Sequence, residues 1–212
     1  VEVSTGPLGQ GIATAVGLAL GEKILENRFL IHRTDKKNKM EKMFDYHVYC
    51  LCGDGDLMEG IAQEAISLAG SWKLNNLIVL YDCNSISLDG DTKHTLDEDI
   101  LKRFEACGWE TLSVSNGNDV KDIDRALDKA KRSSMPTIIR VKTKIGEGSL
   151  LEGTNAVHGK VLDDQDMAQL KQKLGMPDTP FYVHDGAKNT FTAALAQHTS
   201  AKYQEWANEY RQ

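Results

Sequence analysis

The sequence has no apolar run approaching the roughly 20 residues that a helix needs to cross a bilayer, and no membrane partner is expected. It also lacks a positive net charge. Its 31 acidic residues outnumber 25 basic ones, and the net charge of −6 argues against a nucleic-acid partner, which favours a basic face. The four cysteines, Cys50, Cys52, Cys83 and Cys107, form no C-x-x-C pair. Neither a zinc site nor a redox motif is therefore indicated, and we expect buried, reduced thiols in a cytoplasmic protein.

The chain also lacks a starting methionine and the basic-then-apolar layout of a signal peptide. It opens with VEVSTGPLGQG, almost inside a glycine-rich motif, so we expect a truncated or excised piece of a longer protein. A length of 212 residues suits one large α/β domain, or one domain with an appendage.

Helix and strand patterns alternate along the sequence. Strand patterns occupy residues 46–52, 76–82, 110–114 and 137–143, and the continuous apolar run at 76–82 is typical of a strand covered on both faces. Helical patterns occupy residues 9–29, 56–74, 95–109, 119–134 and 199–210. This alternation predicts an α/β fold, a doubly wound parallel sheet with helices on both faces, whose ligands bind at the carboxyl ends of the strands.

The helix expected at 56–74 carries an apolar stripe that should face the core. Its members are Leu57, Ile61, Ala65, Leu68 and Trp72.

Three further local features can be read from the sequence. Thr95 and the acidic residues after it should cap the helix at 95–109. The charged stretch RTDKKNKMEK at 33–42 is expected to be an exposed loop. Beyond Thr143 the chain is rich in glycine and loops, and its polar last thirty residues should end in a surface helix.

A candidate metal site follows two neighbouring strands. Asp54 lies between two glycines in CGDGDLMEG at 52–60, after a strand and before the N-terminus of a predicted helix. Such a helix end attracts an anion, and the carboxylate could hold a hard cation beside it. The next strand places Asn84 thirty residues after Asp54, at the same edge of the sheet. A carboxylate, an amide oxygen and a loop carbonyl suit Mg²⁺ or Ca²⁺.

Each of these residues alone has an ordinary explanation. A Gly-Asp-Gly sequence is usually a turn, and an asparagine after a strand usually bonds its own backbone. The spacing of Asp54 and Asn84 in a strand–helix–strand context favours a metal–diphosphate site over two unrelated turns.

Gly-Asp-Gly followed about thirty residues later by Asn is the signature of thiamine diphosphate enzymes, and the surrounding sequence resembles the diphosphate-binding domain of transketolase. Five motifs occur in order, namely STGPLGQGIATAVGLAL, GDGDLMEGIAQEAISLAGSWKL, NLIVLYDCNSISLDG, DEDILKRFEACGW and KTKIGEGSLLEGTNAVHG. The resemblance runs from about Thr5 to His158. It implies the thiamine diphosphate-binding fold, with a diphosphate- and metal-binding domain at 1–162 and a C-terminal extension or linker at 163–212.

Carried over residue by residue, the resemblance implies that Asp54, Asn84 and the backbone carbonyl of Ile86 bind the metal. Gly55 and Asn84 then contact the diphosphate.

The same resemblance implies three further roles. Gly6, Pro7 and Leu8 match the family segment that lies along the aminopyrimidine of the cofactor. His158 matches a histidine that reaches the diphosphate and the substrate near the reacting carbon. Glu59 matches an acidic residue buried towards a dimer interface, where it links the two cofactor sites.

Three segments depart from the family pattern. The stretch at 33–42 falls where the family has a shorter connection, which indicates a surface insertion. Cys83 stands where the family usually has Asp or Asn, which we expect to alter packing rather than ligation. The sequence HGKVL lacks the proline that usually lies two residues after the histidine that His158 matches, so the loop beyond it is expected to run differently.

The implied activity is transfer of a two-carbon ketol unit from a ketose phosphate to an aldose phosphate, a reaction of the pentose phosphate pathway. The resemblance also implies a homodimer, and we expect it in the cytoplasm. Thiamine diphosphate carries this chemistry as a carbanion and electron sink, with Mg²⁺ or another divalent cation. The pyrimidine-binding domain, which supplies an activating glutamate in the family, does not occur in this sequence. The chain alone is therefore expected to be inactive.

Alternatives remain open. The chain is either a portion of a transketolase or a non-catalytic or split subunit that binds thiamine diphosphate and needs a partner chain. A different metal-dependent phosphate enzyme on the same sheet is a third hypothesis. The related dihydroxyacetone synthase shares all of these motifs.

Overall fold

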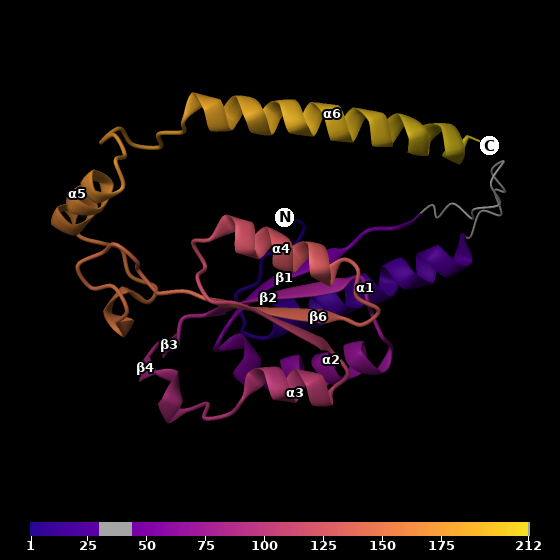
Figure 1. Cartoon of the computed structure of the whole chain (residues 1–212), viewed down its shortest axis with the longest axis horizontal. Helices are drawn as coiled ribbons and strands as arrows, with labels where there is room; N and C mark the ends of the chain where they lie inside the picture. Colours follow the sequence, from indigo (N-terminus) through magenta and orange to yellow (C-terminus); the bar gives the residue numbers. More distant parts are fainter. Residues whose placement is uncertain (30–43, 212) are drawn as a thin grey trace. The chain divides into compact units, whose positions relative to one another are not determined.

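The structure is a computed structural model that describes residues 1–29 and 44–211, so the loop expected at 33–42 lies outside the described residues. The chain falls into two compact units, Val1–Leu162 and Asp163–Gln212 (Figure 1). The first unit carries all the motifs discussed above. The second contains α5 (Asp164–Lys173) and α6 (Asp185–Tyr210).

A parallel sheet forms the centre of the first unit, with its strands in the order β1–β2–β6–β5 in the described part of the chain. These strands are β1 (Val48–Gly53), β2 (Leu77–Cys83), β5 (Glu110–Val114) and β6 (Thr137–Lys142). The chain moves outward from β2 to β5 and then returns, so that β6 pairs with both. The predicted parallel α/β sheet is confirmed, and all its strands end at the same edge.

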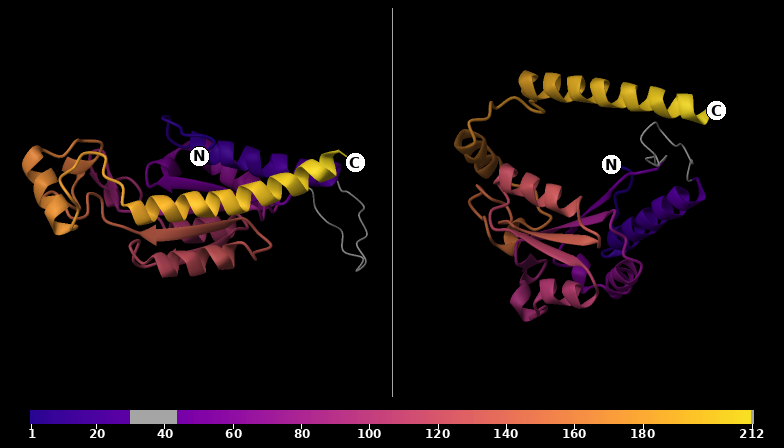
Figure 2. Two further views of the ribbon diagram at one scale, coloured as in Figure 1. Left: turned by 90° about the horizontal axis from the view of Figure 1, so that it is seen from above. Right: turned by 45° about the vertical axis from the view of Figure 1, so that its right-hand side comes forward.

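Helices cover both faces of this sheet (Figure 1 and Figure 2). They are α1 (Gln10–Arg28), α2 (Gly60–Ser71), α3 (Ile100–Ala106) and α4 (Val120–Ala130). Alternate residues of β2 face opposite sides, as the pleat of a strand requires. Leu77 and Val79 pack in a core with α1, α2 and α3, whereas Ile78 packs in a second core with α4.

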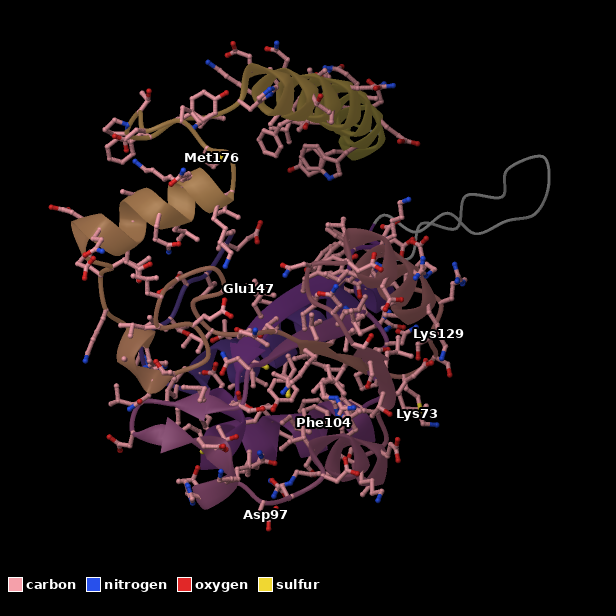
Figure 3. The ribbon with its side chains drawn as sticks, turned by 60° about the vertical axis from the view of Figure 1, so that its left-hand side comes forward. Lys73, Asp97, Phe104, Lys129, Glu147 and Met176 are labelled. Carbon is pink, nitrogen blue, oxygen red and sulfur yellow. The ribbon has the colours of Figure 1, made fainter. Side chains whose placement is uncertain are left out.

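The junction of α2 and α3 shows how the larger core closes. Phe104 is 1% exposed and lies edge-on to Trp109, with ring centroids 5.0 Å apart. The indole N–H of Trp109 donates to the backbone carbonyl of Ile66 at 2.9 Å. In Figure 3 Phe104 lies among the packed side chains, whereas Lys73 and Lys129 lie at the surface. The packing of Phe104 and the hydrogen bond of Trp109 to Ile66 therefore fix α3 against α2.

The helix predicted from residue 56 is wrong at its beginning. Asp56–Met58 form a single 3₁₀ turn (η1), and Glu59 is extended, with φ −77° and ψ 137°. Helix α2 begins only at Gly60. Asp54 therefore precedes a tight turn and not the N-terminus of an α-helix, so the expectation of an anion held at that helix end next to Asp54 needs correction.

The predicted stripe of this helix is also wrong in part. Ile61, Leu68 and Trp72 are 44%, 45% and 48% exposed. The residues of α2 that are buried are Ala62, Ala65, Ile66, Ala69 and Gly70. Small side chains let α2 approach the sheet and α1 closely, which leaves the larger apolar residues on an adjacent, open face.

Other boundaries differ from the sequence prediction. The N-cap of α3 is Asp99, whose carboxylate accepts from the backbone N–H of Lys102 at 3.3 Å, and not Thr95. A short antiparallel hairpin, β3 (Ile86–Ser87) with β4 (Gly90–Asp91), follows β2 and was not predicted. Helix α6 begins well before the surface helix expected at 199–210.

The described residues contain neither a disulfide nor a helix that could cross a membrane. All four cysteines are free, with Cys50 and Cys52 buried and the other two partly buried. No described helix is both long and apolar enough to cross a membrane.

Candidate functional site

Asp54 follows the last residue of β1 and is only 5% exposed. The Tyr81 hydroxyl donates to its Oδ1 at 2.5 Å, and the backbone N–H of Ser85 donates to its Oδ2 at 3.1 Å. No lysine, arginine or histidine in the described ranges forms an ion pair with this carboxylate. A buried carboxylate without a counter-charge is costly, so the position suits a bound cation.

Tyr81 is the hydrogen-bond partner that fixes the direction of Asp54. Burial, together with its hydrogen bond to Asp54, raises the pKa of Tyr81 well above its ordinary value. The phenol therefore keeps its proton at neutral pH and remains a donor. Sequence reasoning missed this residue. The alternation along β2 gives a signal, because Tyr81 shares the face of Leu77 and Val79.

The loop after β2 places Asn84 and Ile86 beside Asp54. Ser85 has a φ of 65°, an unusual left-handed conformation for a residue other than glycine that is often found at functional sites. The Oδ1 atom of Asn84 accepts from the backbone N–H of Ile86 at 2.9 Å. The backbone N–H of Thr92 donates to the carbonyl of Ser85 at 3.1 Å. These two hydrogen bonds therefore fix the turn at Ser85.

These residues supply an oxygen-only ligand set. Asp54 offers a carboxylate, Asn84 an amide oxygen with a remaining lone pair, and Ile86 a backbone carbonyl. Such hard donors suit Mg²⁺ or Ca²⁺. Across the described ranges, no group of three or more His, Cys, Asp or Glu residues could hold a metal. The predicted ligand set is of a different kind, because only one of its three ligands, Asp54, is such a residue.

A cleft opens at this edge of the sheet. Its volume is about 360 Å³, and Asp54, Tyr81, Ser85, Thr92 and Arg140 are among its lining residues. A larger hollow of about 460 Å³ lies at the ends of β5 and β6. It does not include Asp54, so of the two hollows only the smaller one is lined by a candidate metal ligand, Asp54; Asn84 and Ile86 are not among its lining residues.

The segment Gly6–Leu8 lies next to the Gly-Asp-Gly turn. All three of its residues are exposed, with Leu8 52% exposed. A side-chain carbon on Gly55 would lie 3.2 Å from Cδ1 of Leu8. The structure thus brings these two predicted cofactor-binding segments together, although 47 residues separate Leu8 from Gly55 in the sequence.

Glu59 is exposed in the described chain and lies at the N-cap of α2. Its Cβ is 2.8 Å from where a side-chain carbon on Gly9 would be. Glu59 is therefore close to the Gly6–Leu8 segment, and its role at a dimer interface remains a prediction.

His158 ends a glycine-rich loop that is well tied internally. The Gly153 N–H donates to the Ile145 carbonyl at 2.8 Å, and the Asn155 side-chain amide donates to the Leu88 carbonyl at 3.3 Å. The second bond fastens the loop to the connection between β3 and β4. Within the described structure, the buried Nδ1 atom of His158 has no hydrogen-bond partner, which is unusual for a buried polar atom.

The site residues are not all joined by direct contacts. Asp54, Asn84 and Ile86 gather at one turn, and Gly6–Leu8 lie against Gly55. No hydrogen bond among the described residues joins His158 to Asp54 or Asn84. The connection passes instead through the β3–β4 hairpin, which begins at Ile86 and whose Leu88 carbonyl accepts from Asn155.

In sequence and in structure, the chain is similar to the same family of known proteins. The family described as transketolase, thiamine diphosphate binding domain, matches residues 1–212. A probable transketolase of Streptococcus pneumoniae serotype 4 is 42% identical over 207 residues, which are 97% of this chain and 30% of that protein.

Two solved structures are also similar. Transketolase from Leishmania mexicana has a TM-score of 0.90 and 41% identity, over 98% of this chain and 30% of that one. Transketolase from Pichia stipitis, in complex with sedoheptulose 7-phosphate, has a TM-score of 0.91 and 38% identity over the same shares. The chain thus spans about 30% of the length of the relatives it matches.

Proposed function

The chain belongs to the transketolase family, as its thiamine diphosphate-binding domain, and from this we propose that it provides the metal and diphosphate site of a two-carbon ketol transferase. The complete enzyme would take the unit from a ketose phosphate and deliver it to an aldose phosphate. The observation that carries the proposal is the buried Asp54 carboxylate, which is oriented by two donors and has no cation partner in the described part of the chain. The structure of a relative with sedoheptulose 7-phosphate supports sugar phosphates as substrates.

In this proposal Asp54, Asn84 and the Ile86 carbonyl bind Mg²⁺, and Gly55 and Asn84 contact the diphosphate. Ca²⁺ or another divalent cation with the same preference for oxygen is an alternative. When bound, thiamine diphosphate supplies the electron sink for two-carbon transfer.

The remaining roles fall to residues around the diphosphate site. Gly6, Pro7 and Leu8 lie along the aminopyrimidine. His158 donates a hydrogen bond to, or exchanges a proton with, oxygens of the donor or acceptor sugar. Its unpartnered Nδ1 supports this role.

We also propose that the complete protein is a homodimer in the cytoplasm. Ile61, Leu68 and Trp72 form an open apolar face on α2, and Glu59 lies exposed at the start of the same helix. A second copy that covered this face would bury Glu59, as the family resemblance implies. The four free thiols agree with a reducing compartment.

An activity assay of the complete polypeptide tests the function. Purified protein with thiamine diphosphate and Mg²⁺ is expected to transfer a two-carbon unit from xylulose 5-phosphate to an aldose phosphate. A strong preference for formaldehyde as acceptor would indicate a dihydroxyacetone synthase instead. Activity that appears only after a second chain is added would indicate a split subunit, and nucleotide binding without thiamine diphosphate binding would contradict the family role.

Tyr81→Phe is expected to weaken Mg²⁺ binding in the presence of thiamine diphosphate by about 10- to 100-fold, the usual effect of removing a hydrogen bond that orients a metal ligand. The substitution removes only the hydroxyl that holds Asp54. The change in Mg²⁺ affinity is measured by a Mg²⁺ titration, in which the heat of cofactor binding is monitored. Tyr49→Phe is the matched control, because Tyr49 is 49% exposed on β1 and belongs to no proposed ligand set. An unchanged Mg²⁺ affinity in Tyr81→Phe would show that Asp54 needs no such support.

A further inference from the structure

Asp56 joins the two segments that are proposed to hold opposite ends of the cofactor. We propose that Asp56 is a positioning residue, which fixes the aminopyrimidine segment Gly6–Leu8 against the Gly-Asp-Gly metal turn before the cofactor binds. This inference rests on the proposed function. It assigns to Asp56 no contact with metal, cofactor or substrate.

Both carboxylate oxygens of Asp56 are used in this bridge. Oδ1 accepts from the backbone N–H of Gly9 at 2.9 Å, and Oδ2 accepts from the backbone N–H of Gly53 at 2.9 Å. Gly53 ends β1 directly before Asp54, and Gly9 directly follows Leu8. One side chain therefore connects segments that lie 47 residues apart in the sequence. Because Asp56 is half-buried and Gly9 is buried, water competes little for the bond to Gly9.

The bridge also replaces a missing local cap. Gly9 is the N-cap residue of α1 and has no side chain, so α1 receives no cap of its own. The Asp56 carboxylate places a negative charge at this helix end, where the helix dipole favours it. The direction of α1, and of the segment before it, thus depends on a residue of the metal turn.

Close packing on either side of the bridge fixes the distance between the segments. Gly9 has a φ of 79°, and a side-chain carbon there would lie 2.8 Å from Cβ of Glu59. A side-chain carbon on Gly55 would likewise lie 3.2 Å from Cδ1 of Leu8. With no room for another atom at Gly9, loss of the Asp56 bridge lets the segments move apart but not closer. A cofactor that touches both segments would then have to reorder them when it binds.

If Asp56 only capped a helix, its removal would lower stability without weakening cofactor binding. Asp119 is the matched control for such a cap. Its carboxylate caps α4 by accepting from the backbone N–H groups of Lys121 and Asp122, both at 3.1 Å. It belongs to no proposed ligand set. Asp119→Ala should therefore lower the melting temperature without changing cofactor binding.

The test compares Asp56→Ala, Asp56→Asn and Asp119→Ala in the complete polypeptide with saturating Mg²⁺. We expect Asp56→Ala to weaken thiamine diphosphate binding, measured by calorimetry, by about 10- to 100-fold, the size of one or two hydrogen bonds to a charged group. Asp56→Asn, which keeps one acceptor oxygen, should lose less. At saturating cofactor kcat should stay near the wild-type value. Without cofactor, the amide hydrogen of Gly9 should exchange faster in Asp56→Ala than in wild type.

The outcomes separate this inference from the proposed function. If wild-type protein does not bind thiamine diphosphate, the proposed function fails. If wild type binds it and Asp56→Ala binds as tightly as Asp119→Ala, only the positioning role is overturned. Should Asp56→Ala not fold, Asp56→Asn is judged by the same comparison, and wild-type affinity in that variant overturns the role.

Discussion

Asp54→Ala in the complete protein is expected to weaken binding of thiamine diphosphate with Mg²⁺ by several kcal/mol, about 100-fold or more. Asp54 is the only carboxylate in the proposed ligand set, and its charge faces the cation that links the protein to the diphosphate. Tyr81 and Ser85 donate to its two oxygens and fix their direction. Calorimetry with Mg²⁺ and thiamine diphosphate measures the loss.

The matched control is Asp89→Ala. Asp89 lies exposed in the β3–β4 hairpin at the same edge of the sheet, so its removal changes the local charge equally but leaves the proposed ligands intact. Near wild-type affinity is expected for this variant. Unchanged affinity in Asp54→Ala, or an equal loss in Asp89→Ala, would contradict the assignment of the metal site.

His158→Ala is expected to lower turnover of the complete enzyme by about 100-fold or more, the usual effect of losing one positioned acid–base group. The loop that carries His158 is fastened to the β3–β4 connection through Asn155, and the histidine Nδ1 is buried without a partner in the described chain. A substrate oxygen would satisfy that nitrogen. Cofactor affinity should fall much less, because Asp54, Asn84 and Ile86 remain.

Steady-state turnover and cofactor binding are measured together for His158→Ala and for the control His94→Ala. His94 is an exposed histidine in the 3₁₀ turn Thr92–His94, which follows β4, and its removal should change neither quantity. Equal losses in turnover and cofactor affinity for His158→Ala would mean that His158 only anchors the diphosphate. No loss in either would show that the loop has no role in the reaction.

The sheet could be predicted from the sequence because its central strands, β2 and β6, have apolar residues buried on both faces. Leu77, Ile78 and Val79 are all fully buried, and such runs favour a covered parallel strand. The beginning of α2 could not be predicted in this way. Apolar residues recur at helical spacing from Leu57 onward, but the extended backbone at Glu59 interrupts the helix, and periodicity does not detect a single residue of that kind.

The contacts around the candidate site depend on folding over long distances in the sequence. Asp54 and Asn84 could be proposed from a motif and its spacing. The Tyr81 bond to Asp54 spans 27 residues and the Asp56 bond to Gly9 spans 47. The alternation along β2 indicates which face Tyr81 occupies, but no local pattern indicates the partner in either bond. The left-handed conformation of Ser85 is likewise hidden, because serine is not a residue that usually indicates a positive φ.

A crystal structure of the complete protein with thiamine diphosphate and Ca²⁺ tests the metal–diphosphate site most directly. Ca²⁺ scatters more strongly than Mg²⁺ and accepts the same oxygen ligands. The cation is expected at about 2.3–2.6 Å from a carboxylate oxygen of Asp54, Oδ1 of Asn84 and the carbonyl oxygen of Ile86, with the diphosphate completing its coordination. A cation bound elsewhere, or a diphosphate bound without Asp54, would contradict the proposed site.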